Sequence, residues 1–166
     1  MTSGKRLLVP IAAAALAALQ WVPTMPAVNP PVQQWQTLEA NFEVPSAVAA
    51  ILGRACGNCH SNRTSLPWYA KAAPVSWLVL RDVSKARAAM NFSTWATGPG
   101  RNPGIAAATL AAACADVRSG RMPPAPYRTL HPESRLRAAD KQALCDWANH
   151  SSHDLLSRGG TPAGEP

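Results

Sequence analysis

The sequence predicts a small all-α domain of about four helices, and three observations support this fold class. No stretch alternates apolar and polar residues over five positions with β-branched side chains, which is the pattern of a half-buried strand. Four segments instead have apolar residues at helical spacing, with suitable residues where a helix would start or stop. The 166 residues, with 16 prolines and 10 glycines, suit one domain with flanking segments rather than a chain of long continuous helices.

The four predicted helices follow one another through the middle and the end of the chain. The first covers residues 45–55, with a proline early enough that its missing N–H does little harm. The second covers residues 75–90, where apolar and charged residues recur at helical spacing. The third covers residues 102–120 and opens on Asn-Pro, in which Asn can cap the helix and Pro suits the first turn. The fourth covers residues 137–155 and places apolar side chains on one face.

Residues 1–22 have the pattern of an export signal or a membrane anchor. Lys5 and Arg6 precede an apolar run over residues 7–22, sixteen positions long, slightly fewer than the ~20 that a spanning helix prefers. The favoured interpretation is an uncleaved helix that anchors a periplasmic domain to the inner membrane, with the basic pair inside. Cleavage near Ala15–Ala17 is the alternative, and it would release the domain into the periplasm.

The remaining chain divides by composition into three parts. Residues 23–44 contain Pro23, Pro26, Pro30 and Pro31, and they are expected to form an extended tether. Residues 45–152 then form the folded domain. Residues 153–166 form a tail, in which the end of the last helix is followed by a disordered segment rich in Gly and Pro.

The net charge of +7 is concentrated in the predicted domain. Residues 45–152 carry 13 basic and 5 acidic side chains, an excess that would attract an acidic redox partner or an anionic surface. These residues are scattered, without a Lys/Arg run or the interleaved aromatic residues of an RNA-binding segment. Nucleic acid is therefore not an expected partner. An evenly solvated basic surface without functional clustering is the alternative interpretation.

The segment Cys56-Gly57-Asn58-Cys59-His60 has the Cys-x-x-Cys-His spacing of a c-type haem attachment site. Two thiols three positions apart lie about one helical turn from each other, so both can form thioethers with the vinyl groups on one edge of haem. The next residue, His60, can then supply an imidazole nitrogen to the iron. The pattern predicts one haem c, covalently bound through Cys56 and Cys59. An export signal agrees with this, because covalent attachment takes place outside the cytoplasm.

Two other chemistries use a Cys-x-x-Cys pair. A thioredoxin-like redox site would lie at a strand-to-helix junction of a βαβ unit, but here an Ala-rich helix precedes the motif and strand patterns are absent. A zinc site would require a second pair of ligands, whereas Cys114 and Cys145 are 31 positions apart. Both are less favoured than haem. Cys114 and Cys145 remain either as a disulfide between the third and fourth helices or as two buried free thiols, and the sequence leaves this open.

Met122 is the favoured sixth ligand of the iron. It lies 62 residues after His60, and the two prolines that follow it would hold the thioether in a stiff loop. His131 is the nitrogen alternative, and Met90 could be an ordinary packing residue. The metal ligands are therefore predicted to be His60 and Met122.

Residues 52–149 resemble the haem-binding domain family of exported bacterial proteins, which carry one Cys-x-x-Cys-His site and are sometimes joined to cytochrome c peroxidase modules. The resemblance implies a cytochrome-c-like helical fold around one covalently attached haem, with Met122 as the sixth ligand. Cys114, Cys145 and the Ala-rich third helix depart from the family pattern. The matching elements beyond the Cys56–Asn62 motif are Pro67-Trp68-Tyr69, Ala73–Trp77, Asn91–Trp95, Met122-Pro123-Pro124, His131-Pro132-Glu133 and Trp147-Ala148, with Asn29–Val32 similar to the segment after the family's membrane anchor.

Two functions follow from these observations. The first is an exported monohaem c-type cytochrome that transfers electrons, which needs no catalytic acid or base, and we find no convincing group of them. The second is a haem enzyme, associated with peroxidase activity, or a gas or redox sensor, in which the sixth position of the iron is open or labile. The Trp-rich stretch is interpreted as packing, with Trp68, Trp77 and Trp95 expected to exclude water from the haem edge.

Overall fold

The computed structural model describes residues 3–20 and 29–159, and within them the chain forms helices and no strand. The predicted all-α class is confirmed. The described residues contain eight α-helices rather than about four, because short helices separate the longer ones. The α-helices are α1 (Ser3–Leu19), α2 (Leu38–Asn41), α3 (Ser46–Ile51), α4 (Gly57–His60), α5 (Val75–Ala89), α6 (Pro103–Arg118), α7 (Ala125–Leu130) and α8 (Ala138–Gly159). The other helical turns are Gln34–Gln36, the π-helix Leu52–Cys56, Trp68–Lys71, Phe92–Thr97, Pro99–Arg101 and Pro132–Ser134.

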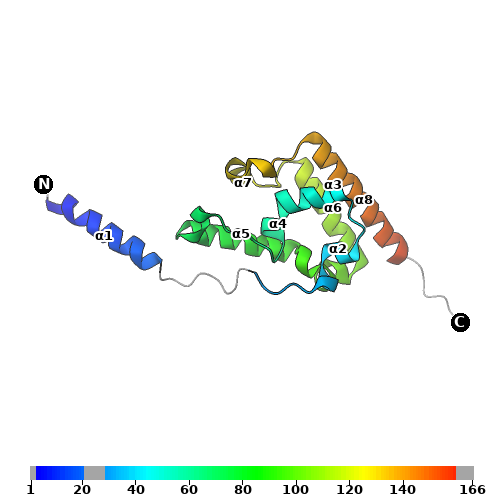
Figure 1. Ribbon diagram of the computed structural model, residues 1–166, viewed down its shortest axis with the longest axis horizontal. Coiled ribbons are helices and arrows are strands. Elements are labelled where there is room, and N and C mark those ends of the chain that lie inside the picture. The colour runs from blue at the N-terminus through cyan, green and yellow to red at the C-terminus, as the bar shows by residue number, and fades with distance from the viewer. Residues whose placement is uncertain (1–2, 21–28, 160–166) are drawn as a thin grey trace.

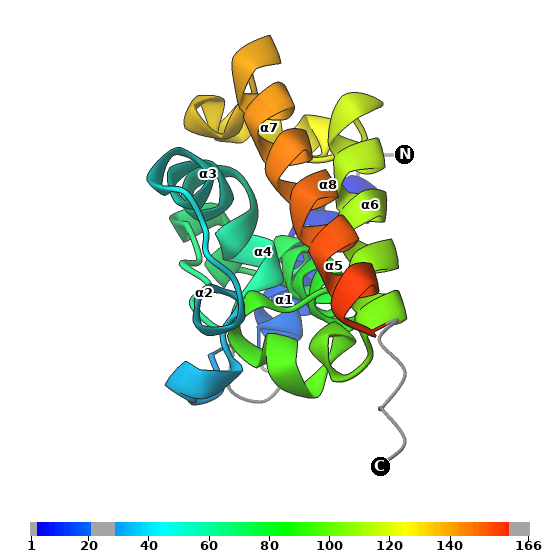
Figure 2. The same cartoon turned by 90° about the vertical axis from the view of Figure 1, so that its right-hand side faces the viewer.

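The pair formed by α6 and α8 is the frame of the domain, and the two helices lie side by side along their length (Figure 2). The predicted cap of α6 is present, because the Asn102 side chain accepts a hydrogen bond from the Ile105 amide at 3.1 Å. Cys114 of α6 and Cys145 of α8 form a disulfide, with their Cα atoms 4.9 Å apart. The question that the sequence left open is therefore answered by a covalent link between the two longest helices of the domain.

The hydrophobic core lies between this helix pair and the segments that precede it. Trp95, Leu110 and Cys145 are each at most 2% exposed, and they belong to one cluster with residues of α2, α3 and the π-helix. The indole of Trp95 packs edge-on against Phe42, with ring centroids 5.3 Å apart. α2, α3 and the π-helix are short, so large side chains from turns as well as from helix faces pack into the core.

The expected tether is folded from Asn29 onward, which differs from the sequence-based expectation. Leu38 is 1% exposed in the core, and Thr37 caps α2 by accepting a hydrogen bond from the Ala40 amide. The Asn29 side chain accepts from the Thr64 amide at 2.8 Å and donates to the Thr64 carbonyl at 2.9 Å. The prolines keep this segment extended, but its apolar residue Leu38 is buried in the core of the domain, which fixes the segment in place. Residues 23–28 lie outside the described part of the chain.

The last helix continues past the predicted boundary at Leu155 to Gly159. Leu155 is partly buried against the core, and the Ser152 hydroxyl donates to the Ala107 carbonyl of α6 at 3.1 Å. Because it packs against α6, the helix extends into the segment that was expected to be a loose tail. Residues 160–166 lie outside the described part.

α1 extends away from the rest of the molecule (Figure 1). Of the helices in residues 3–20 and 29–159, none has both the length and the apolar character needed to cross a membrane. Just after α1, the Gln20 side chain accepts a hydrogen bond from the Ala73 amide at 3.1 Å and donates to the Ala73 carbonyl at 3.3 Å. These two bonds join the end of α1 to the turn that precedes α5.

Asp140 caps the start of α8, and replacing it with asparagine should destabilise the protein by about 1–2 kcal/mol. Its carboxylate accepts from the Arg137 amide at 2.9 Å and pairs with Arg54 at 2.8 Å. The amide bond first, and then the Arg54 and Arg137 side chains, hold the Asp140 pKa below its ordinary value. This stabilisation is complete above the ordinary Asp pKa of about 3.9 and is lost as the pH falls through the lower folded-state value.

Urea unfolding of Asp140→Asn and the parent at pH 7 measures the difference, and repeating it toward pH 3 tests its pH dependence. The difference should shrink as the pH falls. Asp146→Asn is the control, because Asp146 is exposed and bonds only to Gln142 on its own helix. Equal stability of the parent and Asp140→Asn at pH 7 would contradict the assigned role.

Candidate functional site

The Cys-x-x-Cys-His motif is held by a short helix and the loop that follows it. Cys56 ends the π-helix, and α4 carries Cys59 and His60. Two hydroxyls accompany the end of α4: Ser61 donates to the Gly57 carbonyl and Thr64 donates to the Asn58 carbonyl, each at 2.7 Å. A four-residue helix leaves most of its carbonyls without partners, so these bonds stabilise the motif in a helical turn.

Arg87 of α5 fixes the other side of this loop. Its guanidinium donates to the Ser61 carbonyl at 2.8 Å and to the Thr64 hydroxyl at 2.9 Å. α5 is therefore attached directly to the residues that follow His60. The backbone around the motif is therefore stabilised both by hydroxyl groups of the following loop and by the half-buried Arg87 side chain of α5.

Two adjoining cavities meet at the motif. One has a volume of about 220 Å³ and the other about 360 Å³, and Cys56, His60, Ala89 and Met122 line both of them. The first cavity is lined mainly by apolar residues of α6 and α8, and the second adds Cys59 and the charged side chains of α5. The sequence-predicted residues Cys56, Cys59, His60 and Met122 thus lie around these two adjoining cavities. Its apolar lining suits a flat hydrophobic cofactor.

His60 has one ring nitrogen engaged by the backbone. Nδ1 lies 2.9 Å from the Met90 carbonyl oxygen, and because a carbonyl only accepts, Nδ1 carries the proton. The neutral ring then has its lone pair on Nε2. Burial lowers the pKa of His60, which favours this neutral form, and Phe92 stacks on the ring with centroids 5.9 Å apart. A neutral imidazole oriented by a carbonyl is the arrangement that a metal-ligating histidine requires.

The two motif thiols are free and are held in their protonated form. Burial is the main cause that raises the pKa of the Cys56 thiol to about 12, and the neighbouring Cys59 adds to it. Burial also raises the pKa of Cys59. A dithiol redox site needs a lowered thiol pKa, so the surroundings of this pair are opposite to those of a thioredoxin-like centre. Within the described residues no cluster of three metal-binding side chains of the His, Cys, Asp or Glu type occurs.

The three candidate sixth ligands have different surroundings. Met122 lines both cavities from the loop after α6, and its amide donates to the Asp116 carbonyl at 3.1 Å. Met90 also lines the first cavity, but its backbone is bonded to His60, which places it beside that ring. His131 lies in a separate network: Nε2 is 2.7 Å from the Tyr69 hydroxyl and Nδ1 is 3.1 Å from Glu133. Met122 is therefore the candidate whose position fits best.

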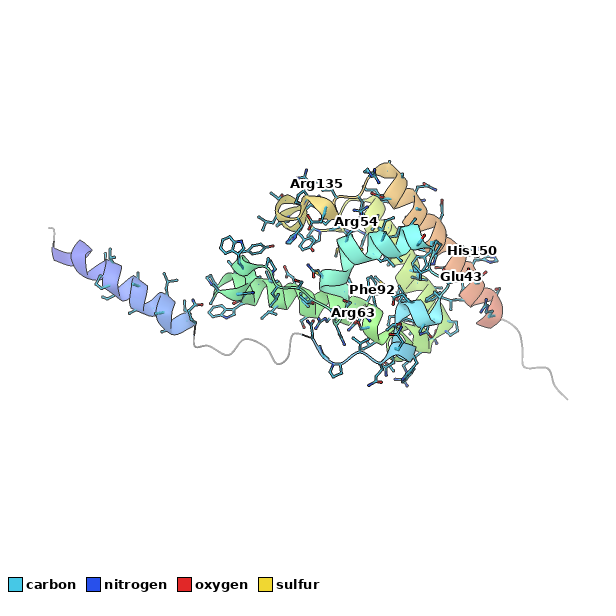
Figure 3. The ribbon with its side chains drawn as sticks, in the orientation of Figure 1. Glu43, Arg54, Arg63, Phe92, Arg135 and His150 are labelled. Atoms are coloured by element: carbon cyan, nitrogen blue, oxygen red, sulfur yellow. A yellow bond between two sulfur atoms is a disulfide. The ribbon has the colours of Figure 1, made fainter. Side chains whose placement is uncertain are left out.

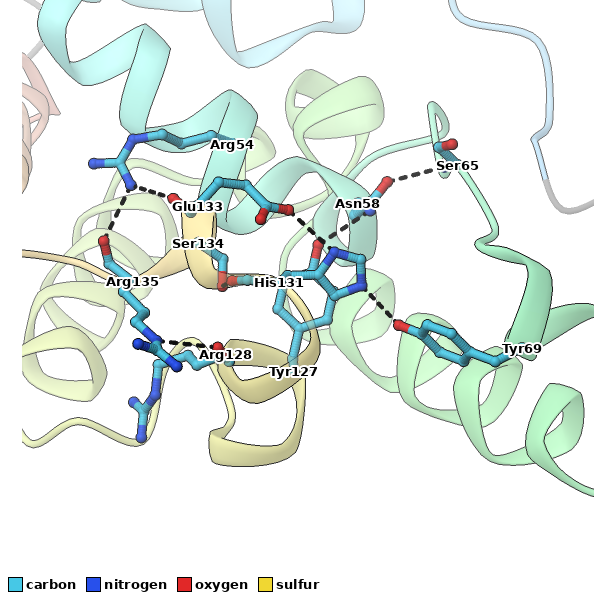
Figure 4. Close-up of polar contacts among 10 residues, drawn as sticks. All are labelled: Arg54, Asn58, Ser65, Tyr69, Tyr127, Arg128, His131, Glu133, Ser134 and Arg135. Atoms are coloured by element: carbon cyan, nitrogen blue, oxygen red, sulfur yellow. Dashed lines mark hydrogen bonds and ion pairs between the residues drawn. The ribbon is translucent and has the colours of Figure 1, made fainter.

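A polar network that the sequence analysis missed joins the motif to α7 (Figure 4). The Asn58 amide donates to the Tyr127 hydroxyl at 3.0 Å, and the Tyr127 ring stacks on His131 with centroids 4.3 Å apart. Asn58 also accepts from the Ser65 amide at 2.9 Å. The second variable residue of the motif thus links α4 to the helix that follows Met122. Nothing in the local sequence around Asn58 indicates a partner 69 positions away.

Arg54 supports the same region from the π-helix. Its guanidinium donates to the Glu133 carbonyl at 2.7 Å and to the Arg135 carbonyl at 3.2 Å. Arg54 and Arg135 lie close together although they are 81 positions apart in the chain (Figure 3). The chain around residues 133–135 is therefore tied to the helix that leads into Cys56.

The prediction for the tryptophans is wrong in part. Trp95 is buried, but it packs in the core against Phe42 rather than along the cavities. Trp147 of α8 lines the first cavity instead. Trp68 is 83% exposed and lies on the short turn that precedes α5, outside the core cluster. Trp77 is half-buried. The presence of tryptophan in the sequence could not show whether a given side chain lies in the core, on a cavity wall or on the surface.

A comparison with known families identifies the domain that contains these cavities. The model of the haem-binding domain family matches residues 14–150. The chain belongs to this family. No curated protein and no solved structure matches the chain. The haem-binding domain covers the motif, both adjoining cavities and all helices from α2 onward except the end of α8. Haem binding is thus the property of the domain to which these cavities belong.

Proposed function

We propose that the protein is an exported monohaem c-type cytochrome that transfers electrons. Haem c would be held covalently by Cys56 and Cys59, with His60 and Met122 as the two iron ligands. The observation that carries this proposal is the orientation of His60 by the Met90 carbonyl, with Met122 lining the same apolar cavity. An imidazole and a thioether are the ligand pair of low-spin electron-transfer haems.

The residues of the chain have separate tasks in this function. Each thiol would add across one vinyl group, so that sulfur bonds to one vinyl carbon and the thiol proton goes to the other, and no oxidant is needed. The bound haem would supply one-electron exchange between its ferric and ferrous states. Leu110, Leu144 and Trp147 line the cavity and would exclude water from a bound haem, which would favour the less charged ferrous state and raise the reduction potential.

Export and membrane attachment belong to the same proposal. Covalent haem attachment occurs outside the cytoplasm, and the disulfide between α6 and α8 suits an oxidising compartment such as the periplasm. The basic pair followed by an apolar run supports an uncleaved N-terminal helix that holds the domain at the inner membrane. Cleavage would give a free periplasmic form. N-terminal sequencing of the mature protein distinguishes these forms.

The proposed partner is an acidic redox protein. The basic excess of residues 45–152 falls by about two when two ionised haem propionates are counted, and it remains positive. Electrostatic attraction would raise the encounter rate by roughly one to three orders of magnitude at low salt. Reduction kinetics with an acidic electron-transfer protein across salt concentrations test this. A rate independent of ionic strength would remove the steering and leave the haem assignment intact.

The covalent attachment is tested on protein made in a host that has haem c maturation machinery. The protein should keep its haem through denaturing electrophoresis and show a Soret band. Haem that separates from a chain with both motif cysteines intact would contradict the thioethers. A bound zinc or a free dithiol would give no Soret band.

Met122→Ala should convert the protein into one that binds carbon monoxide readily in the ferrous state. The parent should resist the ligand because sulfur occupies the sixth position, and its ferric spectrum should contain a Met-to-iron charge-transfer band that the variant lacks. Met90→Ala is the matched control: it removes the other cavity-lining thioether while the backbone carbonyl that orients His60 remains. If the Met122→Ala spectrum equals that of the parent and both bind carbon monoxide, the enzyme or sensor function is favoured.

A further inference from the structure

The positive charge of the described domain is unevenly placed. Residues 61–90 carry five Lys or Arg and one Asp, and residues 121–131 carry two Arg and no acidic residue. Residues 132–159, which include α8, carry four basic and four acidic side chains and are neutral overall. The excess therefore lies in the segments that form α5, α7 and their flanking loops, next to the haem motif rather than on the α8 side of the domain.

Large apolar side chains are exposed in the same region. Trp68 is 83% exposed, Leu130 60%, Leu78 53% and Val75 40%. Three of these, Val75, Leu78 and Leu130, line a cavity of about 380 Å³ between α5 and α7, which Cys59 also lines. We call these four residues the Trp68 face. Exposed apolar side chains that gather around one depression mark an interaction surface.

The end of α1 is fixed at the edge of the Trp68 face. Gln20 makes two hydrogen bonds to the backbone of Ala73, which lies between Trp68 and Val75 in the chain. α1 leaves the domain beyond this end of α5 (Figure 1). If α1 enters a membrane, the Trp68 face is therefore the part of the domain that lies nearest to that membrane.

We propose that the Trp68 face lies against the surface of an anionic lipid bilayer; this inference rests on the proposed insertion of α1 into the membrane. Tryptophan prefers the membrane interface, where its ring is apolar and its N–H stays hydrated. Leu78 and Leu130 would enter the same layer, while exposed Lys71 and Lys85 would face the lipid phosphates. The basic excess of this region favours an anionic over a neutral membrane.

The arrangement would define where electrons enter or leave. Cys59 lines the same cavity as Val75, Leu78 and Leu130 of the Trp68 face, so this proposed haem-bonding residue lies on the side of the domain that would face the bilayer. A redox partner that lies in the membrane or close to its surface would then reach the haem over a shorter distance than a partner diffusing in the periplasm. An acidic soluble protein could also fit a basic, apolar face, but it would not explain why α1 is attached at its edge.

The test uses the full-length, haem-loaded protein with a nitroxide at one new cysteine, introduced by Leu78→Cys or by Ile105→Cys. Ile105 is 58% exposed, comparable to Leu78, but it lies at the start of α6. Each labelled protein, with its haem kept ferric, is bound to vesicles of phosphatidylglycerol and phosphatidylethanolamine, or of phosphatidylcholine alone. The same labelled protein without vesicles is the reference, so that relaxation of the label by the iron contributes equally to both measurements. At position 78, accessibility to oxygen should rise and accessibility to a water-soluble nickel chelate should fall on the anionic vesicles, with little change at position 105.

Adding Lys71→Gln and Lys85→Gln to the Leu78→Cys protein should reverse most of this change on the anionic vesicles. Flotation with the vesicles measures the insertion of α1 separately. Protein that fails to float contradicts both the membrane anchor and the proposed contact of the Trp68 face with the bilayer. The haem spectrum tests the cytochrome proposal independently. Protein that floats with position 78 as accessible to the nickel chelate as position 105 overturns the face alone. Immobilisation of the label only after an acidic protein is added assigns the surface to a protein partner and also overturns it.

Discussion

Cys56→Ser and Cys59→Ser together should abolish the haem stain that the parent protein retains after denaturing electrophoresis. The hydroxyl of serine does not form the thioether, so any haem that enters the cavity would be held only by His60, Met122 and apolar packing. Denaturation destroys the cavity and would release it. The effect is all-or-none, because the covalent bond is either present or absent in each molecule.

The single variants sharpen this test. Cys56→Ser and Cys59→Ser alone each leave one thiol in place, so each should retain some covalent haem with a Soret band shifted from that of the parent. The matched control is the pair Cys114→Ala and Cys145→Ala, whose sulfurs are already bonded to each other. This control should retain its haem on the gel. Haem retained by the Cys56/Cys59 double variant would show that attachment is elsewhere in the chain.

The parts of the fold that could be predicted are those encoded by neighbours in the chain. α5 and α6 begin and end within a few residues of their predicted bounds, since the Asn102 cap and the αL conformation of Gly120, with φ of 75°, act over a single turn. The haem motif was identifiable for the same reason, because its five residues occupy about one helical turn. Local rules therefore predicted these helices, and they also predict the Cys-x-x-Cys-His motif as the attachment site, which stays a prediction.

The parts that could not be predicted depend on contacts between distant segments. Leu38 is buried because a pocket in the core accepts it, although the proline content around it favours an extended tether. The carbonyl that orients His60 comes from Met90, 30 positions later, and every residue offers such a carbonyl, so composition cannot select it. Tyr69 and His131 likewise meet across 62 positions. Such pairs are decided by how the helices pack.

Replacing Cys114 and Cys145 together with alanine should lower the free energy of unfolding by about 3–4 kcal/mol. The disulfide closes a loop of 31 residues, and a loop of that length restricts the unfolded chain by about this amount. Both side chains are buried in the core between α6 and α8, so losing the sulfur atoms also costs packing and places the expected loss at the upper end of this range. Urea unfolding followed by far-UV circular dichroism measures the change.

The single variants separate the cross-link from the packing. Cys114→Ala alone and Cys145→Ala alone each break the disulfide, so each should lose most of what the double variant loses, and the two losses should not add. Additive losses of about 1 kcal/mol each would mean that the sulfurs contribute as ordinary buried groups. The Soret band serves as the second readout, because α6 and α8 both line the cavity beside His60 and Met122. If the disulfide also stabilises the cavity, the Soret band of the variants should change at a lower urea concentration than that of the parent. If the circular dichroism and Soret transitions of each variant still occur at the same urea concentration, the disulfide affects only global unfolding. This is the expected result for a domain in which the helix pair and the haem cavity share one core.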